Sequence, residues 1–450
     1  MEFDPIAYIN EPRWQESRLG LDRVRELLER MGRPQDRLRF VHVAGTNGKG
    51  STCVYLASIL QAAGYRTGLF TSPYIERFEE RIRVDGRDIS ADDLREVTLF
   101  VREHAEAVAS LEGEHPTEFE LMTAVALEHF ARSGCDIVVL EVGLGGRLDS
   151  TNVIDAPEVA VIARIGLDHT ALLGGTLAAV AGEKAGIVKP GSAVVSWPQE
   201  SEAMDVVARV ARACGDELTV PAWESLETGP VKWRVDGPVR TFAYCGSAFE
   251  TRLLGCYQPA NAALAIEAAG ALRRRGWEVS DEALRAGIRQ AEWPGRFEVL
   301  PQGEGRPTFV VDGGHNPQGT HALAESLQEV FPDVKPVFII GVLEDKDYPA
   351  MLEEVLALGG AFVAVEPPNP RALPACKLAR AIRWTGQDLL GCSACVRSHE
   401  ARTFDEAVER AADLAGASGV VCAFGSLYSV ASVKRALARW SGGAPARDNG

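Results

Sequence analysis

The sequence lacks an excess of positive charge. Its 450 residues include 47 Lys and Arg against 63 Asp and Glu, which gives a formal net charge of −16 at pH 7. A surface that binds the phosphate backbone of nucleic acid needs clustered Lys and Arg in excess. We therefore expect no nucleic-acid partner, and any anionic ligand must be held by a local arrangement of residues.

Long apolar runs are absent as well. No uninterrupted apolar stretch approaches the ~20 residues that a membrane-spanning helix requires, and residues 1–13 have no basic start followed by an apolar core, as a secretory signal would. The nine cysteines are scattered, and the close pair Cys392 and Cys395 has no second pair to complete a zinc site. These absences predict a cytoplasmic protein with reduced thiols and no membrane partner.

Apolar runs alternate with helical patterns along most of the chain. The runs expected as strands are 40–44, 67–70, 136–142, 159–165, 193–197, 309–312, 337–340, 362–365 and 420–424. This alternation predicts α/β architecture with doubly wound parallel sheets. Residues 223–249, which are richer in Pro, Gly and aromatics, are expected as short antiparallel strands.

Trp293–Arg296 interrupts this pattern, and a fresh α/β series follows it. We therefore expect two domains. The N-terminal one, residues 1–294, would contain a doubly wound, mostly parallel sheet with a small antiparallel subsheet and would bind ATP. The C-terminal one, residues 295–450, would be a smaller Rossmann-like α/β domain.

A glycine-rich turn follows the first expected strand, Phe40–Ala44. The glycines in Gly45–Gly50 let the backbone bend closely enough for amide groups to surround phosphate oxygens. The helix that follows adds its positive dipole end, Lys49 adds a full charge, and Ser51 or the threonine after it would offer a hydroxyl to magnesium. The turn predicts polyphosphate binding, although Gly50 separates the lysine from the hydroxyl and breaks the generic GxxxxGK[ST] spacing. The alternative is an ordinary strand-to-helix turn with a surface lysine.

Four polar side chains follow separate apolar strands of the first domain, namely Lys49, Ser72, Glu141 and His169. Ligands of open α/β sheets bind beyond the carboxyl ends of the strands. A hydroxyl, a carboxylate and an imidazole there would together hold a divalent ion that bridges nucleotide phosphates. Magnesium prefers oxygen ligands and keeps its waters, while the histidine leaves manganese open as an alternative. Taken singly, a histidine or glutamate after a strand is more often a hydrogen-bonded structural residue.

The second domain contains a comparable pattern. Asp312–Pro317 follows an expected strand and opens a helix, with Asn316 as the N-cap and Pro317 at the first helical position. This pattern fits a well-capped helix with a surface histidine, or a second phosphate contact that faces the first domain across a cleft. Further on, Lys346 stands between two aspartates, where a site for a charged substrate and a solvated charge cluster fit equally well.

A set of motifs occurs in the order that is typical of one enzyme family. They are His42–Ser51, Phe70–Pro73, Glu141–Gly146, Leu167–His169, Glu183–Ile187, Pro294–Arg296 and Asp312–Pro317. On these motifs the sequence resembles the folylpolyglutamate synthases and dihydrofolate synthases of the muramyl-ligase superfamily. Two positions depart from the usual family pattern: Gly314 stands where alanine is common in the motif DGAHNP, and Tyr74 where histidine is common.

The resemblance implies an ATP-dependent ligation. In this family ATP phosphorylates a carboxylate of the substrate, and the amine of L-glutamate attacks the acyl phosphate, so that an amide, ADP and phosphate form. The residues implied to bind ATP are Thr46, Asn47, Gly48, Lys49, Gly50, Ser51, Asn261, Arg296, Asp312 and His315. Those implied to hold Mg²⁺, with Mn²⁺ as the alternative, are Ser72, Glu141 and His169. Lys49, Lys184 and His315 are implied to be catalytic.

The resemblance also gives Lys184 a specific role. This residue matches the lysine that becomes carbamylated in the superfamily, which would turn its amine into a carboxylate able to hold a second metal ion. Without the resemblance it would pass as an ordinary helix-surface cation. Thr117, Phe119 and Asp149 resemble the family's pterin-binding segment, and we expect them, together with Lys346, to contact the substrate. The expected small-molecule partners are a folate or dihydropteroate and L-glutamate, bound by a monomer.

Other functions are alternatives on the sequence. A muramyl-type ligase would act on cell-wall precursors, but those members generally carry a third, amino-terminal substrate domain, and little sequence precedes the first strand here. A nucleotide-binding regulator without ligase activity would be expected to lose Lys184 or His315, and both are present. A plain NTPase or kinase would release phosphate without requiring glutamate.

Overall fold

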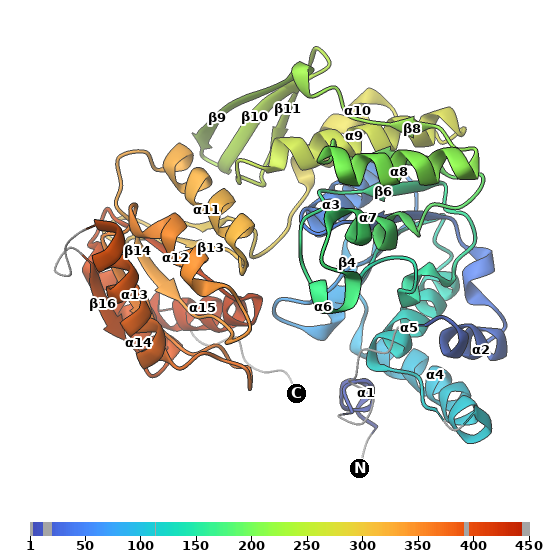
Figure 1. Cartoon of the computed structure of the whole chain (residues 1–450), viewed down its shortest axis with the longest axis horizontal. Coiled ribbons are helices and arrows are strands. Elements are labelled where there is room, and N and C mark those ends of the chain that lie inside the picture. The colour runs from blue at the N-terminus through green and yellow to red at the C-terminus, as the bar shows by residue number, and fades with distance from the viewer. Residues whose placement is uncertain (1–2, 12–19, 113, 391–395, 443–450) are drawn as a thin grey trace. The chain divides into compact units, whose positions relative to one another are not determined.

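The structure is a computed structural model that describes residues 3–11, 20–112, 114–390 and 396–442 (Figure 1). By its internal contacts the chain divides into two compact units. One unit comprises Met1–Thr228, Phe242–Thr251 and Pro259–Ala291, and the other comprises Gly229–Thr241, Arg252–Gln258 and Glu292–Gly450. The chain therefore passes between the units several times, and the simple division into 1–294 and 295–450 stays a prediction.

The cysteines within the described ranges are free thiols. The close pair Cys392 and Cys395 lies outside the described residues. None of the described helices combines the length and the apolar character that are needed to cross a membrane.

The first unit is built on an eight-stranded sheet with strand order β4-β3-β2-β5-β1-β6-β7-β8. Its parallel strands are β1 (Phe40–Ala44), β2 (Thr67–Phe70), β5 (Ile137–Glu141), β6 (Val159–Ile162), β7 (Ala193–Ser196) and β8 (Leu218–Thr219). An antiparallel hairpin of β3 (Ile82–Val84) and β4 (Arg87–Asp88) extends one edge. The expected parallel, doubly wound sheet is confirmed, and the hairpin adds an antiparallel edge to it.

Helices cover both faces of this sheet. Those of the first unit are α1 (Pro5–Ile9), α2 (Asp22–Arg30), α3 (Lys49–Ala62), α4 (Ala91–Glu112), α5 (Glu118–Arg132), α6 (Thr170–Leu173), α7 (Leu177–Ala185), α8 (Ser201–Cys214), α9 (Gln258–Arg274) and α10 (Asp281–Gln290). Phe40 of β1 joins the core formed with α2, α4 and α5, and Ala44 joins the core formed with α7 and α8. Because side chains alternate along a strand, His42 lies on this same face of β1. α3 packs against β1, β2 and β5, and α10 packs against α3.

A small sheet and a second large sheet complete the chain. The small sheet has the order β11-β10-β9, with β9 (Leu226–Arg234), β10 (Gly237–Tyr244) and β11 (Ser247–Thr251), as expected for residues 223–249. The second unit contains a six-stranded sheet with the order β12-β13-β17-β14-β15-β16. Its strands are β12 (Glu298–Leu300), β13 (Thr308–Val311), β14 (Val337–Ile340), β15 (Ala361–Ala364), β16 (Arg397–Glu400) and β17 (Val420–Phe424).

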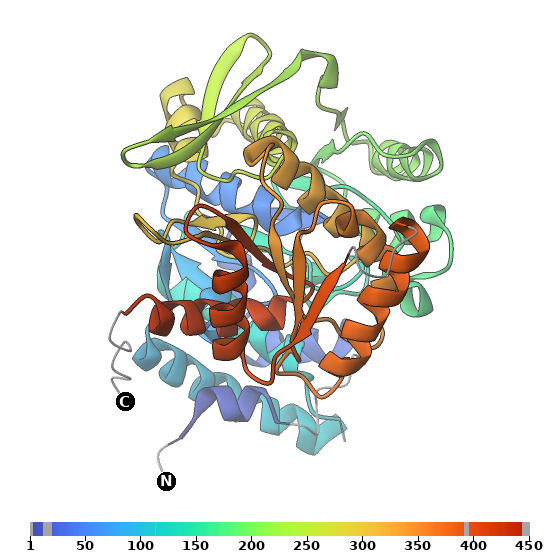
Figure 2. The ribbon, with the colours of Figure 1, turned by 90° about the vertical axis from the view of Figure 1, so that its left-hand side faces the viewer.

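The six-stranded sheet is parallel apart from β12, which pairs antiparallel with β13. Its helices are α11 (Pro317–Val330), α12 (Tyr348–Leu356), α13 (Ala375–Leu390), α14 (Phe404–Ala415) and α15 (Leu427–Trp440). α11, α12 and α13 contribute to the main core, and α14 and α15 pack together against the sheet. Figure 2 turns this unit toward the viewer and shows its strands between helices. The expected α/β architecture is confirmed for this unit too.

Candidate active site

The glycine-rich turn joins β1 to α3, and two of its positions leave no room for a side chain. Gly48, the N-cap of α3, has φ +88, and a Cβ there would lie 2.6 Å from Oδ1 of Asn261. Gly45 has φ +150, and a Cβ there would lie 2.7 Å from Cβ of Ala163. Both φ angles are ones that L side chains rarely adopt. The turn therefore requires glycine at these positions for steric reasons as well as for backbone conformation.

The carboxyl end of β6 holds this turn in place. The amides of Thr46 and Asn47 donate to the carbonyl of Arg164 at 2.8 and 3.1 Å. Oγ1 of Thr46 also donates to the carbonyl of Gly166 at 2.9 Å and accepts from its amide at 3.0 Å. These hydrogen bonds hold the turn against β6 within the protein itself. The start of α3, on the other side of the turn, is therefore positioned without a ligand.

The start of α3 has the features of an anion site. Its first helical hydrogen bond runs from the amide of Thr52 to the carbonyl of Gly48 at 3.0 Å, so the amides of Lys49, Gly50 and Ser51 form the helix N-terminus, where the dipole is positive. Gly48 provides no side-chain cap. Nζ of Lys49 lies 3.4 Å from the carbonyl of Thr46, so the ammonium group folds back over the turn. This arrangement suits a phosphate group.

Glu141 and Ser72 meet next to this turn, because β5 lies between β2 and β1 in the sheet. Glu141 ends β5 with only 3% of its surface exposed, and its Oε2 accepts a hydrogen bond from the Ser72 amide at 3.1 Å. His169 differs: its side chain is about half exposed, its φ is +50, and its Nε2 lies 3.8 Å from Oδ2 of Asp168. The structure therefore brings together Ser72 and Glu141 of the expected metal ligands.

A magnesium ion fits the donors present. The part of the chain that the structure describes holds no group of three or more His, Cys, Asp or Glu side chains suited to a metal. Mg²⁺ usually binds one or two carboxylates and completes its shell with water and substrate phosphates. The buried carboxylate of Glu141, with Ser72 beside it, meets that need. The set Ser72, Glu141 and His169 stays a prediction.

Lys184 is buried rather than on a helix surface. It lies on α7 with 5% of its surface exposed, and its Nζ donates to the carbonyl of Gly45 at 2.9 Å. Burial, and then the charge of Lys49, lower the pKa of the Lys184 amine to about 7. Near neutral pH a substantial fraction of this amine is therefore uncharged and nucleophilic, as carbamylation would require.

Phe119, which is expected to contact the substrate, lies against the last residue of β2 and the loop after β5. The ring of Phe119 covers Gly143, where a Cβ would lie 2.4 Å from its Cζ, and it lies 5.9 Å from the ring of Phe70. Thr117 caps α5: its Oγ1 accepts from the Glu120 amide at 3.4 Å, and its amide donates to Glu120 Oε2 at 2.7 Å.

Asp149 is buried, and both of its carboxylate oxygens accept hydrogen bonds from nearby residues. Oδ2 accepts from the amide of Leu144 at 2.7 Å. Oδ1 accepts from the amide of Thr151 at 3.0 Å and from its hydroxyl at 2.5 Å. Burial raises the pKa of the Asp149 carboxyl, although these hydrogen bonds oppose the shift. Substrate contacts of Thr117, Phe119 and Asp149 stay a prediction.

In the second unit, Asp312 organises the residues expected to bind nucleotide. It ends β13 and is buried; Oδ2 accepts from the Phe297 amide at 2.7 Å and from the Tyr257 hydroxyl at 3.4 Å. Oδ1 accepts from the Gly314 amide at 2.6 Å. Burial raises the pKa of the Asp312 carboxyl, and the charge of Arg296 opposes the shift. Tyr257 stands in none of the motifs, so sequence reasoning missed it.

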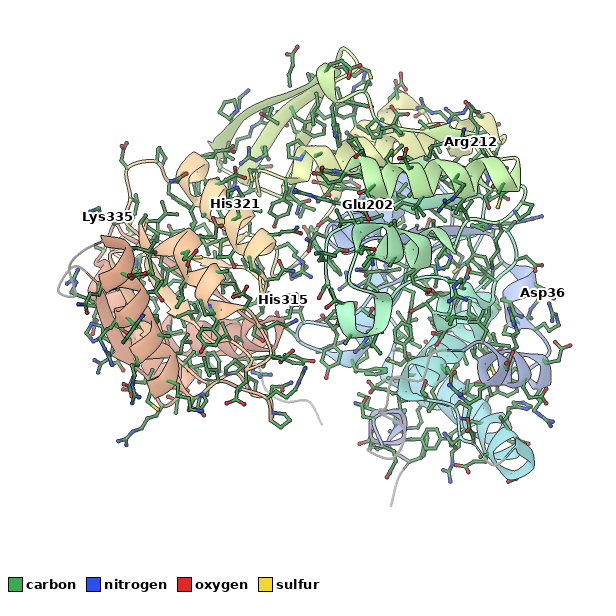
Figure 3. The ribbon with its side chains drawn as sticks, in the orientation of Figure 1. Asp36, Glu202, Arg212, His315, His321 and Lys335 are labelled. Atoms are coloured by element: carbon green, nitrogen blue, oxygen red, sulfur yellow. The ribbon has the colours of Figure 1, made fainter. Side chains whose placement is uncertain are left out.

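Arg296 and His315 lie beside Asp312. A Cβ on Gly313 would come within 2.3 Å of Nη1 of Arg296, so glycine at this position leaves room for the guanidinium. Nδ1 of His315 lies 2.9 Å from the carbonyl of Gly313. His315 stands directly before α11 (Figure 3), whose predicted cap is confirmed: Oδ1 of Asn316 accepts from the Gly319 amide at 2.7 Å.

Lys346 follows β14 at a place where the flanking acids have structural partners. Oδ2 of Asp345 lies 3.2 Å from Nη1 of Arg371, and Oδ1 of Asp347 accepts from the Ala350 amide as the N-cap of α12. The lysine side chain is half-buried. Its contact with substrate stays a prediction.

Two family profiles match the chain. The Mur ligase middle domain matches residues 43–269, and the Mur ligase glutamate ligase domain matches residues 295–427. The chain is 36% identical to the dihydrofolate synthase/folylpolyglutamate synthase of Bacillus subtilis, over 96% of this chain and 99% of that protein. It is 33% identical to the protein of the same name from Escherichia coli, over 97% of this chain and 96% of that protein.

Solved structures agree with these matches. The folylpolyglutamate synthase of Mycobacterium tuberculosis, solved with ADP and AMPPCP, gives a TM-score of 0.82 at 30% identity and covers 98% of this chain and 100% of its own. An Escherichia coli structure with DHPP and ADP gives 0.81 at 29% identity, with 97% and 98% covered. The two family matches, the relatives that cover nearly the whole chain and the shared fold therefore lead to one conclusion: this chain belongs to the dihydrofolate synthase/folylpolyglutamate synthase family of the Mur ligases.

Proposed function

We propose that this protein is an ATP-dependent ligase that adds L-glutamate to a folate, to dihydropteroate, or to both, with release of ADP and phosphate. The observation that carries the proposal is the group at the start of α3. There a capless helix N-terminus, the Lys49 ammonium and the buried Lys184 amine converge on one turn. Relatives that match nearly the whole chain bear the names dihydrofolate synthase and folylpolyglutamate synthase.

The chain's own residues suit the first chemical step, in which the substrate carboxylate accepts a phosphoryl group. A triphosphate and a carboxylate repel each other, and catalysis requires positive charge where negative charge collects. Lys49 and the helix dipole supply it on the protein side. Mg²⁺, held by Glu141 with Ser72 and His169, would neutralise further phosphate charge when it is bound. In the second unit, Asp312, Arg296 and His315 bind the nucleotide in this proposal.

The acceptor is proposed to lie near Phe119. Its ring, with Phe70 behind it, offers an aromatic surface on which a flat pterin can stack. Thr117 and Asp149 resemble other parts of the family's pterin-binding segment and are proposed to contact the acceptor as well. Lys346 is proposed to attract a carboxylate of the substrate. The M. tuberculosis and E. coli structures were solved with nucleotides and, in the second case, with DHPP. We also propose that the protein acts as a monomer in the cytoplasm.

An ADP-release assay tests this function. Dihydropteroate and tetrahydrofolate are supplied separately, each with and without L-glutamate, and the product is identified by mass. A ligase releases ADP only when both the acceptor and glutamate are present, and one glutamate residue is added to the product. Release that ignores glutamate would indicate an NTPase or kinase. Activity only with a cell-wall precursor would indicate a muramyl-type ligase, and either result contradicts the proposal.

A further inference from the structure

A buried chain of hydrogen bonds connects β1 to the loop that follows β5. Nε2 of His42 lies 2.9 Å from Oγ1 of Thr151, and that hydroxyl lies 2.5 Å from Oδ1 of Asp149. All three side chains are buried, with exposed surfaces of 0, 0 and 4%. Asp149 and Thr151 are only two positions apart in the sequence, whereas His42 is 109 positions from Thr151. This series of hydrogen bonds therefore exists only in the folded protein.

The direction of these bonds follows from the acid at one end. An ionised carboxylate only accepts, so the Thr151 hydroxyl donates to Asp149 and in turn accepts from a protonated Nε2 of His42. Burial, and then the charge of Lys189, lower the pKa of His42 to about 3, which keeps the ring neutral. Its Nδ1 has no hydrogen-bond partner among the described residues. The imidazole is thus committed to a single bond, the one to Thr151.

Asp149 is in turn hydrogen-bonded to the loop Gly143–Arg147. The amide of Leu144 donates to its Oδ2, and the Asp149 amide donates to the carbonyl of Gly146 at 3.1 Å. Asp149 thereby closes the loop on itself. Because Glu141 comes immediately before this loop, the position of the loop bears directly on the position of that carboxylate.

The loop also packs against the end of α7 that carries Lys184. The Arg147 amide donates to the carbonyl of Glu183 at 2.7 Å, and a Cβ on Gly146 would lie 2.6 Å from the same carbonyl and 3.0 Å from Cα of Lys184. Nδ2 of Asn152 bridges the carbonyls of Arg147 and Gly186 at 3.0 and 3.1 Å. Lys184 then reaches back to the carbonyl of Gly45, three positions after His42 in the chain.

We propose that Thr151 is a positioning residue whose hydroxyl, between His42 and Asp149, holds the loop Gly143–Arg147 so that Glu141 and Lys184 face the phosphate-binding turn. The connections start at His42 in β1 and return, through Lys184, to the carbonyl of Gly45, the residue that directly follows β1. In this reading Asp149 anchors the loop through both of its carboxylate oxygens. The inference rests on the proposed function only for its kinetic test, because the hydrogen-bond circuit exists without any ligand.

The central comparison is Thr151→Val against Thr151→Ser. Valine keeps the shape and removes the hydroxyl, which leaves a buried imidazole N–H and a carboxylate oxygen without their bond. Serine keeps the hydroxyl. Thr98→Val is the matched control, because Thr98 is fully buried in α4 and its Oγ1 has no hydrogen-bond partner within the described ranges. If Thr151→Val does not fold, His42→Leu against His42→Gln gives the same comparison, since a glutamine amide can take the place of Nε2.

Two measurements decide the matter. Removal of groups that orient metal ligands commonly costs about 10–100-fold in metal affinity or activity. Because the loop positions Glu141, we expect Thr151→Val to lower kcat by that factor, with little change in KM for the acceptor. Thr151→Ser should restore most of the activity, and Thr98→Val should behave as wild type. Hydrogen exchange on the ligand-free protein should show faster exchange of the Leu144 and Arg147 amides in Thr151→Val only.

Several results would overturn this inference. They are an unchanged kcat in Thr151→Val, an effect confined to KM for the acceptor, the absence of rescue by serine, or unchanged exchange of the loop amides. The exchange measurement needs no substrate. If wild-type protein showed no glutamate-dependent ADP release, the proposed function would fail, while faster loop exchange in Thr151→Val would still support the circuit.

Discussion

Replacement of Gly48 by alanine should impair both folding and nucleotide binding, by amounts that can be separated. Two structural costs arise at this position. The φ of +88 places an alanine in the left-handed region, which costs about 1–2 kcal/mol. The new Cβ would also lie 2.6 Å from Oδ1 of Asn261, a distance that Cβ contacts essentially never show, so the turn or Asn261 must shift.

Gly215→Ala isolates the first of these costs. Gly215 caps α8 in the same unit with φ +75, and a Cβ there would meet nothing within 4 Å. We expect Gly215→Ala to lower the free energy of unfolding by about 1–2 kcal/mol from backbone strain alone. Gly48→Ala should lose more than that. The difference between the two variants measures the cost of the collision with Asn261.

Urea titration and ATP calorimetry are the assays. ATP affinity should be unchanged in Gly215→Ala and at least about tenfold weaker in Gly48→Ala, because about 1.4 kcal/mol of displacement cost corresponds to that factor. The double variant Gly48→Ala/Asn261→Ala removes the colliding oxygen, so its loss of stability should be smaller than the sum of the single losses. Equal stabilities of Gly48→Ala and Gly215→Ala, together with wild-type ATP affinity in both, would refute the reasoning.

Three further predictions concern the lysines and the buried histidine. Lys49→Ala should abolish glutamate-dependent ADP release while far-UV circular dichroism and the urea midpoint stay as in wild type; full activity would count against the phosphate site. Lys184→Ala should be poorly active and partly rescued by short carboxylic acids, whereas Lys184→Ala with wild-type turnover would remove this residue from the mechanism. The pKa of His42 is about 3 in the folded protein and about 6.5 in the unfolded chain. Between these two values the unfolded state binds one more proton than the folded state. The free energy of unfolding therefore falls by about 1.4 kcal/mol for each pH unit as the pH drops from 6.5 toward 3. His42→Gln should therefore lose less stability than wild type between pH 6 and 4 in urea titrations, and parallel losses would contradict the buried neutral imidazole.

Local sequence patterns determined the elements and several of their ends. The expected strands lie within a few residues of β1, β2, β5, β6, β7, β13, β14, β15 and β17. The cap at Asn316 is made as the sequence indicated, since an N-cap acts on amides two or three residues away. The turn before α3 was equally readable, because glycine, lysine and a helix start lie next to one another in the chain.

The partners of the buried polar residues were decided by tertiary structure alone. Lys184 is 139 positions from its acceptor Gly45, and Tyr257 is 55 positions from Asp312, so no local pattern reports either contact. Lys184 reads as a surface cation on its own helix, and only the packing of α7 under the phosphate turn removes it from water and lowers its pKa. The same holds for His42, Thr151 and Asp149. A sequence states which groups carry charge and hydrogen-bonding capacity, whereas burial and distance, which set their strength, exist only once strands that are far apart in the chain have become neighbours.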